Sequence, residues 1–302
     1  MNILIIGGTG FVGLELSKRL KDAGHIITLF HRNHAAGLPF KQTLGDCDSP
    51  DELRISIGNA EPDCVIHTTA MNKRHIAALE KALTTTMRTV IISSADVYKA
   101  FEVFNRLSDA PIQDVPLVET SPLRDVRHFC RFNGDEYEKI DVETAALGSK
   151  VIEPVILRLG MVFGTNDPNR RFHDRIEAAQ DGCIALSADA AAWKTCYCGV
   201  KNAALGIELA AEKGKAGEIY NLADKDAFAE SEWSAKIWAL LNHNPKIILI
   251  DEKSNTANFA QHLILDTTKI RRELGYDEQH TAEQHLAEMI DCHADYWEGC
   301  QP

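Results

Sequence analysis

Two hydrophobic patterns alternate along the first half of the chain. Short, nearly continuous apolar runs predict buried strands at residues 2–6, 26–31, 64–68, 89–93 and 151–157. Between them, apolar positions recur with helical spacing in residues 13–23, 75–83 and 137–147. Strands and helices in this order predict a doubly wound α/β fold with a parallel sheet, which binds its ligands at the carboxyl ends of the strands.

A glycine-rich turn joins the first predicted strand to the first predicted helix. Residues 7–13 read Gly-Gly-Thr-Gly-Phe-Val-Gly. Gly7 can adopt the positive φ that lets the chain leave the strand sharply, Gly10 lets backbone N–H groups approach a phosphate, and Gly13 lets the helix pack closely on the strand. In this strand–turn–helix context the motif predicts a site for the pyrophosphate of a dinucleotide.

Beyond about residue 163 the alternation becomes irregular. Shorter segments with helical or strand-like patterns lie at residues 203–211, 219–222, 232–241, 247–250 and 282–297. We therefore expect a dinucleotide-binding domain in residues 1–163, which also receives some later segments. Residues 164–302 are expected to form mainly a smaller lobe that binds the substrate.

Charge and cysteine content narrow the class of ligand. The 302 residues include 44 acidic and 32 basic side chains, and the net charge of −12 disfavours nucleic acid and anionic membrane surfaces as partners. No apolar stretch is long enough to span a membrane, and the first strand leads into the glycine turn instead of a signal cleavage site. Cys196 and Cys198 are the only close cysteine pair and have no second pair to complete a zinc site, so no metal is expected. These features predict a cytoplasmic protein that binds a small molecule.

Further motifs follow the glycine turn in a fixed order. They are Gly45-Asp46 and the segments 63–70, 93–98, 119–123, 157–164, 217–221 and 269–275. Together they resemble the extended or atypical short-chain dehydrogenase/reductases, the NAD-dependent epimerase/dehydratase family. The resemblance runs along the whole chain and implies a Rossmann-like sheet with a smaller C-terminal substrate lobe. Relatives often dimerise, so a homodimer is compatible with it.

The resemblance also implies which residues hold the dinucleotide. The pyrophosphate would lie on Gly7, Thr9, Gly10, Phe11, Val12 and Gly13, the adenine beside Asp46 and Cys47, and the ribose side along Thr68, Thr69 and Ala70, with Lys139 on the ribose. Relatives that prefer NAD usually carry an acidic residue at the end of the second strand, where this chain has His31 and Arg32. Because a guanidinium can bind a 2′-phosphate, NADP is favoured and NAD is the alternative.

Enzymes of this family pair a tyrosine with a lysine four residues later on one helix face. The lysine lowers the pKa of the phenol, which then acts as acid or base. Here Tyr137 precedes Lys139 by only two residues, and position 135 is aspartate. On one continuous helix the two side chains would point about 200° apart. They can meet only if the helix begins between them.

Three interpretations of the catalytic group stay open. Tyr137 can reach the nicotinamide from an irregular helix start. Asp96, two residues after Ser94, or Tyr98 can take over the acid–base role. In the third interpretation the site binds a cofactor without turnover. Ser94 matches the family's catalytic Ser/Thr and can hydrogen-bond a substrate oxygen, or it satisfies backbone groups at a strand end.

The leading expectation is an NADP-dependent oxidoreductase, epimerase or dehydratase that acts on a small polar metabolite such as a nucleotide sugar. The alternative is a non-catalytic sensor or regulatory protein that binds NADP(H). Two further features, His67 and the Arg170-Arg171 pair, have both a structural and a functional interpretation. We expect His67 to be a hydrogen-bonded core histidine, and Arg170 and Arg171 either to grip a phosphate or carboxylate or to lie in an exposed turn.

Overall fold

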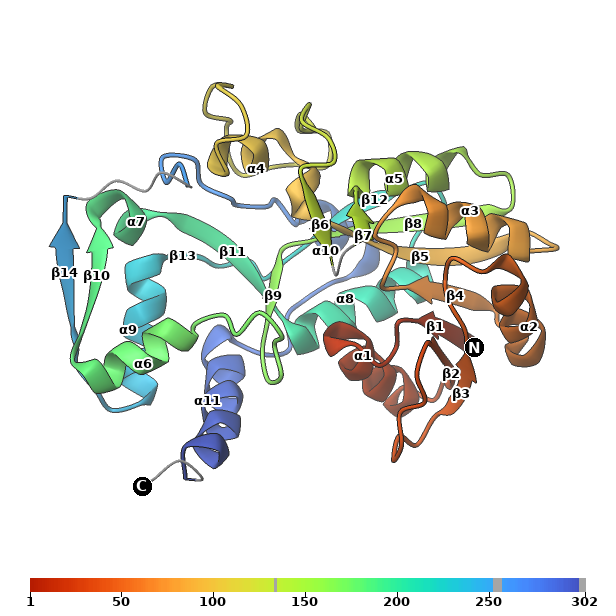
Figure 1. Ribbon diagram of the computed structural model, residues 1–302, viewed down its shortest axis with the longest axis horizontal. Helices are drawn as coiled ribbons and strands as arrows, with labels where there is room; N and C mark the ends of the chain where they lie inside the picture. Colours follow the sequence, from red (N-terminus) through yellow and green to blue (C-terminus); the bar gives the residue numbers. More distant parts are fainter. Residues whose placement is uncertain (133–134, 252–256, 299–302) are drawn as a thin grey trace.

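A seven-stranded parallel sheet forms the larger part of the computed structural model, which describes residues 1–132, 135–251 and 257–298 (Figure 1). The strand order is β12-β8-β5-β4-β1-β2-β3, and every neighbouring pair is parallel. The strands are β1 (Asn2–Ile6), β2 (Ile26–His31), β3 (Lys41–Leu44), β4 (Cys64–His67), β5 (Met87–Ser94), β8 (Ile152–Leu159) and β12 (Ile219–Leu222). The predicted doubly wound α/β fold is therefore confirmed.

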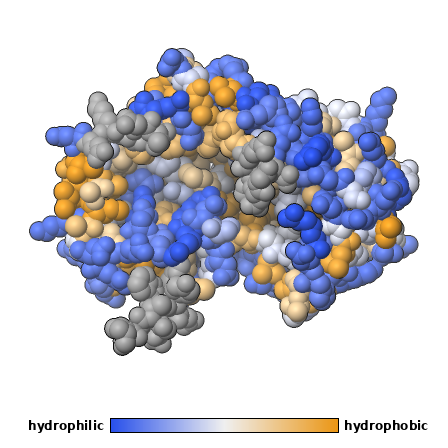
Figure 2. All heavy atoms as spheres, in the orientation of Figure 1, coloured by the Kyte–Doolittle hydropathy of each residue, from blue (hydrophilic) through white to orange (hydrophobic). Residues whose placement is uncertain are grey.

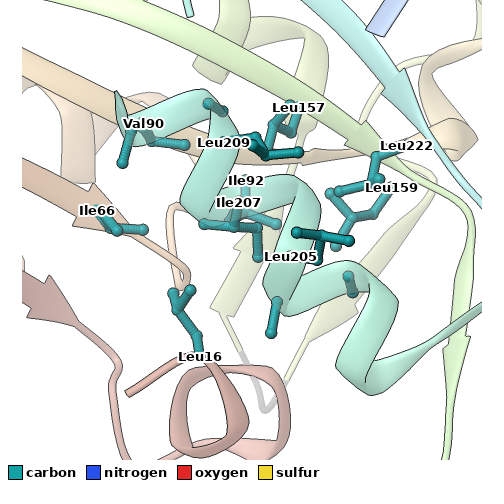
Figure 3. Close-up of a cluster of buried hydrophobic side chains, with 14 of the residues drawn as sticks. Leu16, Ile66, Val90, Ile92, Leu157, Leu159, Leu205, Ile207, Leu209 and Leu222 are labelled. Atoms are coloured by element: carbon teal, nitrogen blue, oxygen red, sulfur yellow. The ribbon is translucent and has the colours of Figure 1, made fainter. Parts of the chain in front are cut away.

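Helices cover both faces of this sheet. One face packs against α1 (Phe11–Asp22), α8 (Val200–Lys213) and α10 (Thr268–Leu274), and the other against α2 (Pro50–Ala60), α3 (Lys73–Ala82) and α5 (Lys139–Gly148). Figure 3 shows Leu205, Ile207 and Leu209 of α8 lying over the strands. Because both faces are buried, the central strands are apolar throughout instead of alternating.

The C-terminal part forms a smaller lobe beside the sheet (Figure 1). It contains one three-stranded sheet, β13-β11-β9, and one two-stranded sheet, β10-β14. Its elements are β9 (Met161–Phe163), α6 (His173–Asp181), β10 (Cys183–Ser187), α7 (Ala188–Ala192), β11 (Lys194–Gly199), β13 (Ala227–Ala229), α9 (Glu230–Leu240), β14 (Lys246–Ile250) and α11 (Ala282–Glu298). The division at residue 163 remains a prediction, although α8 and β12 come later in the chain and lie in the layers of the large sheet.

Two surface observations complete the fold. Three consecutive apolar side chains of β14, Ile248, Leu249 and Ile250, are exposed and form the apolar patch at the left edge of Figure 2. Of the helices in the described ranges, none has the length and apolar character needed to cross a bilayer.

The segment before α5 differs from the sequence prediction. A helix was expected over residues 137–147, but α5 begins at Lys139 and Tyr137 ends a short strand, β7 (Asp135–Tyr137). This strand pairs antiparallel with β6 (Cys130–Phe132). Glu138 separates strand from helix, because its side chain accepts a hydrogen bond from the backbone N–H of Ile140 at 3.1 Å and so caps α5.

Candidate functional site

The glycine turn has the geometry that its sequence predicts at two positions. Gly7 has a φ of 85°, and a Cβ atom there would lie 2.4 Å from Oγ1 of Thr68. A Cβ atom at Gly13 would lie 2.4 Å from the carbonyl oxygen of Gly7. The positive φ of Gly7 and the close packing at Gly13 are therefore confirmed, and both positions require glycine.

The turn leaves the N-terminus of α1 open to a ligand. Gly10 is the N-cap residue of this helix, and no side chain caps it. The N–H groups of the first turn, which includes Phe11 and Val12, have no acceptor within the helix. A cradle of backbone donors at a positive helix end, next to Gly7 and Gly13 where the packing admits no side chain, fits the pyrophosphate of a dinucleotide.

The predicted adenosine residues lie at the neighbouring strand ends. His31 ends β2; it is buried, and in the described structure neither ring nitrogen has a hydrogen-bond partner. Arg32 follows it and is exposed, with no hydrogen-bond or ion-pair partner among the described residues. Burial raises the pKa of the Cys47 thiol to about 11, with Asp46 adding to this rise and the nearby Arg32 opposing it. The guanidinium of Arg32 therefore lies near the Asp46-Cys47 segment and is exposed to solvent.

On the ribose side, Thr68 and Ala70 are already held in place. The hydroxyl of Thr68 donates to the carbonyl oxygen of Ile6 at 2.9 Å. The carbonyl oxygen of Ala70 accepts a hydrogen bond from Lys139. Thr69 lies between them, with Cγ2 2.4 Å from the Cβ position at Gly7. The segment therefore closes over the glycine turn as the dinucleotide groove requires.

A cavity of about 430 Å³ lies between the carboxyl edge of the sheet and the smaller lobe. Its lining includes Ser94, Asp96, Tyr137 and Lys139, so the structure brings the four predicted catalytic residues together. Phe11 and Val12 also line it, which makes the cavity continuous with the N-terminus of α1.

Tyr98 does not belong to this group. Its side chain is buried outside the cavity lining, and its hydroxyl donates to Oδ1 of Asn221 at 2.5 Å. The alternative that Tyr98 is the acid is therefore wrong. The ring of Tyr98 packs against Arg158 with 4.8 Å between the guanidinium carbon and the ring centre.

Tyr137 and Asp96 form a hydrogen-bonded pair inside the cavity. The phenol donates to Oδ2 of Asp96, while the buried Oδ1 has no hydrogen-bond partner in the described structure. Burial raises the pKa of Asp96, and burial together with the Asp96 charge raises the pKa of Tyr137 well above its ordinary value. Ser94 completes the group, because its hydroxyl oxygen accepts from the backbone N–H of Asp96 at 3.3 Å. This arrangement can hold and move one proton.

Lys139 joins the pair from the first residue of α5. Its ammonium donates to the carbonyl oxygens of Ala70 at 2.8 Å and Ile92 at 3.0 Å, and it lies 5.6 Å from the ring centre of Tyr137. Burial lowers the pKa of Lys139 to about 8, although Asp96 and Glu143 oppose this shift. Because α5 begins after Tyr137, the strand presents the phenol and the helix presents the ammonium to the same cavity.

Lys139 gives the stability of the protein a measurable pH dependence. Its pKa of about 8 lies below the ordinary 10.5, so between these values the unfolded chain binds more protons than the folded protein. The contribution of this group to the free energy of unfolding therefore rises with pH across the window. From its lower to its upper end, we expect the wild type to gain about 1–3 kcal/mol relative to Lys139→Met in denaturant titrations. A difference that is independent of pH would contradict this account.

The catalytic candidates are positioned by a buried ion pair, which the sequence pattern did not predict. Arg124 contacts Glu138 twice, with Nη1 2.9 Å from Oε2 and Nη2 2.6 Å from Oε1, and both side chains are fully buried. Nε of Arg124 also donates to the carbonyl oxygen of Asp96 at 2.9 Å. The guanidinium of Arg124 therefore fixes Asp96 relative to Glu138, the residue between Tyr137 and Lys139. The only sequence signal was an arginine directly after the 119–123 motif.

The other family-like motifs meet in a buried polar network below the cavity. Arg158 binds both carboxylate oxygens of Glu143, at 3.0 and 2.7 Å, and Glu143 also accepts from the hydroxyl of Ser93 at 2.6 Å. The backbone N–H of Asn221 donates to Oε1 of Glu119 at 2.9 Å. These motif residues connect β5, α5, β8 and β12, so their hydrogen bonds stabilise the fold.

His67 and Arg171 differ from the first interpretations. His67 is buried in the core as expected, but in the described structure neither ring nitrogen has a hydrogen-bond partner, and burial lowers its pKa well below the ordinary value. The hydrogen-bonded part of that prediction is wrong. Nη1 of Arg171 lies 3.0 Å from both carboxylate oxygens of Asp167 and donates to the carbonyl oxygen of Val162 at 2.8 Å. Arg171 is thus an ion-paired residue of the loop.

The fold and the site together define a doubly wound α/β protein with a dinucleotide-type glycine turn beside a tyrosine–lysine pair. Residues 3–107 match the model of the NAD dependent epimerase/dehydratase family, which agrees with the resemblance found in the sequence for that part of the chain. A search of curated protein sequences found no match.

Several solved structures share the fold over nearly the whole chain. dTDP-glucose 4,6-dehydratase from Bacillus anthracis in complex with NAD has a TM-score of 0.74 and 17% identity, with 99% of this chain and 98% of that chain covered. UDP-glucose 4-epimerase from Thermotoga maritima with UDP-glucose has a TM-score of 0.74 and 16% identity, with coverage of 98% and 100%. RMD from Pseudomonas aeruginosa complexed with NADPH has a TM-score of 0.71 and 16% identity, with coverage of 98% and 100%. At this level of identity the likeness shows the fold.

Proposed function

We propose that the protein is a nicotinamide-dependent oxidoreductase, epimerase or dehydratase of the short-chain dehydrogenase type. The observation that carries this proposal is the meeting of Tyr137, Asp96 and Lys139 in a cavity continuous with the glycine turn. Solved structures of the same fold contain NAD or NADPH, which supports a nicotinamide dinucleotide as the cofactor. A cytoplasmic location and a homodimer remain predictions.

In this proposal the side chains and backbone of the protein bind the cofactor and transfer the proton. The N-terminus of α1 binds the pyrophosphate, and Lys139 orients the ribose. When bound, the nicotinamide supplies hydride transfer. Tyr137 donates a proton to, or accepts one from, the substrate oxygen. Asp96 is hydrogen-bonded to the phenol and takes up or returns that proton, while Ser94 hydrogen-bonds the substrate oxygen.

The cofactor is proposed to be NADP, with NAD as the alternative. His31 and Arg32 stand where a carboxylate would accept from the 2′-hydroxyl of NAD, and Arg32 has no partner among the described residues. We expect Arg32→Ala to weaken NADPH binding by about 1–3 kcal/mol and NADH binding much less, because only NADPH loses a charge-assisted hydrogen bond. Isothermal titration with both cofactors measures this. Arg54→Ala on the exposed face of α2 is the control, and equal losses for both cofactors would refute the preference.

A non-catalytic NADP(H) sensor is the second candidate. It is favoured by one observation, that the ammonium of Lys139 is held by two backbone carbonyls. Absorbance at the nicotinamide band, followed with NADPH and a panel of carbonyl compounds and nucleotide sugars, separates the two candidates. Oxidation of NADPH establishes an enzyme. Tight NADPH binding with a silent panel favours a sensor. The panel includes nucleotide sugars because the sequence predicts a small polar metabolite and the names of similar structures contain such compounds.

A further inference from the structure

The cavity has two chemically different sides. The sheet and α5 supply Ser94, Asp96, Tyr137 and Lys139. The remaining apolar part, which we call the outer wall, is built by α4 (Lys99–Phe104), β11 and three loop segments, one of which leads into β6. Its principal side chains are Phe101, Leu117, Phe129, Cys196, Leu263 and Leu265.

Thr195 and Cys196, the polar side chains that β11 contributes to the outer wall, are already hydrogen-bonded. The hydroxyl of Thr195 donates to the carbonyl oxygen of Leu263 at 3.0 Å. The sulfur of Cys196 accepts from the backbone N–H of Leu265 at 3.1 Å, and burial raises the pKa of this thiol to about 11, so it is uncharged near neutral pH. Single β-bridges join Leu117 to Leu265 and Thr195 to Leu263, which fixes the wall as one surface.

The cations that line the cavity in the described structure also have partners. Arg171 is neutralised by Asp167 and further held by the carbonyl oxygen of Val162. Lys139 donates to the carbonyl oxygens of Ala70 and Ile92. Moving a phosphate group out of water is costly unless charged donors replace its hydration. The described lining offers no uncommitted cation for a diphosphate.

One polar spot remains on the sheet side. The hydroxyls of Ser94 and Tyr137 lie together beside Asp96 in the lining, whose other side chains are mostly apolar. We infer that the substrate is an uncharged compound with an apolar body and a single carbonyl or secondary alcohol group, and not a nucleotide sugar. The inference rests on the proposed function and replaces its expected substrate class.

Binding measurements test this inference separately from cofactor binding. The protein is first titrated with NADPH, and failure here counts against the proposed function alone. Protein with and without saturating NADPH is then titrated with uncharged ketones that have linear, cyclic and aryl bodies, such as 4-phenyl-2-butanone, and with UDP-glucose. We expect at least one ketone to bind about tenfold or more tightly than UDP-glucose, because the wall buries apolar area and offers no phosphate donors.

Variants of the wall complete the experiment. Leu263→Ala and Leu265→Ala should each weaken ketone binding about tenfold while NADPH binding stays unchanged, since each removes apolar area from the wall. Val118→Ala is the control, because this exposed valine does not line the cavity and its loss should change neither affinity. The inference is overturned if UDP-glucose binds as tightly as the best ketone, if no ketone binds, or if both wall variants retain wild-type ketone affinity.

Discussion

The variant Tyr137→Phe should lose about 10²- to 10⁴-fold in kcat while it keeps its affinity for the dinucleotide, because it removes only the phenolic hydroxyl that transfers the proton. The phenol lines the cavity and donates to Asp96, and Lys139 lies 5.6 Å from its ring centre. Steady-state kinetics with the identified substrate, together with cofactor titration, provide both readouts. The loss should appear in kcat, because the hydroxyl acts in the proton transfer.

Two further variants make this result interpretable. Tyr98→Phe is the matched control, since the hydroxyl of Tyr98 is bonded to Asn221 outside the cavity lining. It should lower stability by about 1 kcal/mol and leave kcat within about threefold of the wild type. Asp96→Asn should impair turnover as well, because an amide cannot take up the proton. A normal rate for Tyr137→Phe would instead assign the acid role to Asp96 or to a water molecule.

The second large effect is expected in stability. Arg124→Met should lower the free energy of unfolding by about 3–5 kcal/mol, because the buried carboxylate of Glu138 loses its bidentate partner and keeps only the partly exposed Arg127, whose Nε lies 3.3 Å away. Both side chains of this pair are fully buried. Glu138 also caps α5 and accepts from the backbone N–H of His128 at 2.9 Å. Denaturant unfolding followed by circular dichroism measures the change.

The matched control uses an exposed ion pair. Arg54 and Asp51 are 2.6 Å apart on the surface of α2, and Arg54→Met should cost less than about 1 kcal/mol. The double variant Arg124→Met with Glu138→Gln should recover part of the loss, since neither of these two positions then carries a buried charge. A loss below about 1 kcal/mol for Arg124→Met would show that Glu138 finds other compensation.

The central strands could be predicted because their burial on two faces leaves a continuous apolar run. β4, for example, is buried along its whole length, from Cys64 to His67. β3 gave no such signal, because Lys41–Leu44 is an edge strand with only one neighbour, and it is largely polar. α2 could have been recognised, since Ser49 caps it and Pro50 begins it.

The site was harder to predict because one contact decides it. The two-residue spacing correctly excluded a Tyr137–Lys139 pair on one continuous helix. It also showed that the two side chains could meet if the helix begins between them. Whether the helix begins between them depends on Glu138, which is tied to Arg124 fourteen positions earlier in the chain. Hydrophobic periodicity carries no information on such a contact. The apolar outer wall was equally hidden, because its side chains come from segments as distant as Phe101 and Leu263.

The order in which the cavity is assembled has a consequence for protein synthesis. The glycine turn and Tyr137 are made early, the last strand of the large sheet ends at Leu222, and the outer wall is completed only by Leu263 and Leu265. A chain terminated before residue 263 lacks both β-bridges of that wall. A chain released or cut before that point would thus lack the part of the cavity lining that Leu263 and Leu265 supply, and only the finished chain has the whole lining.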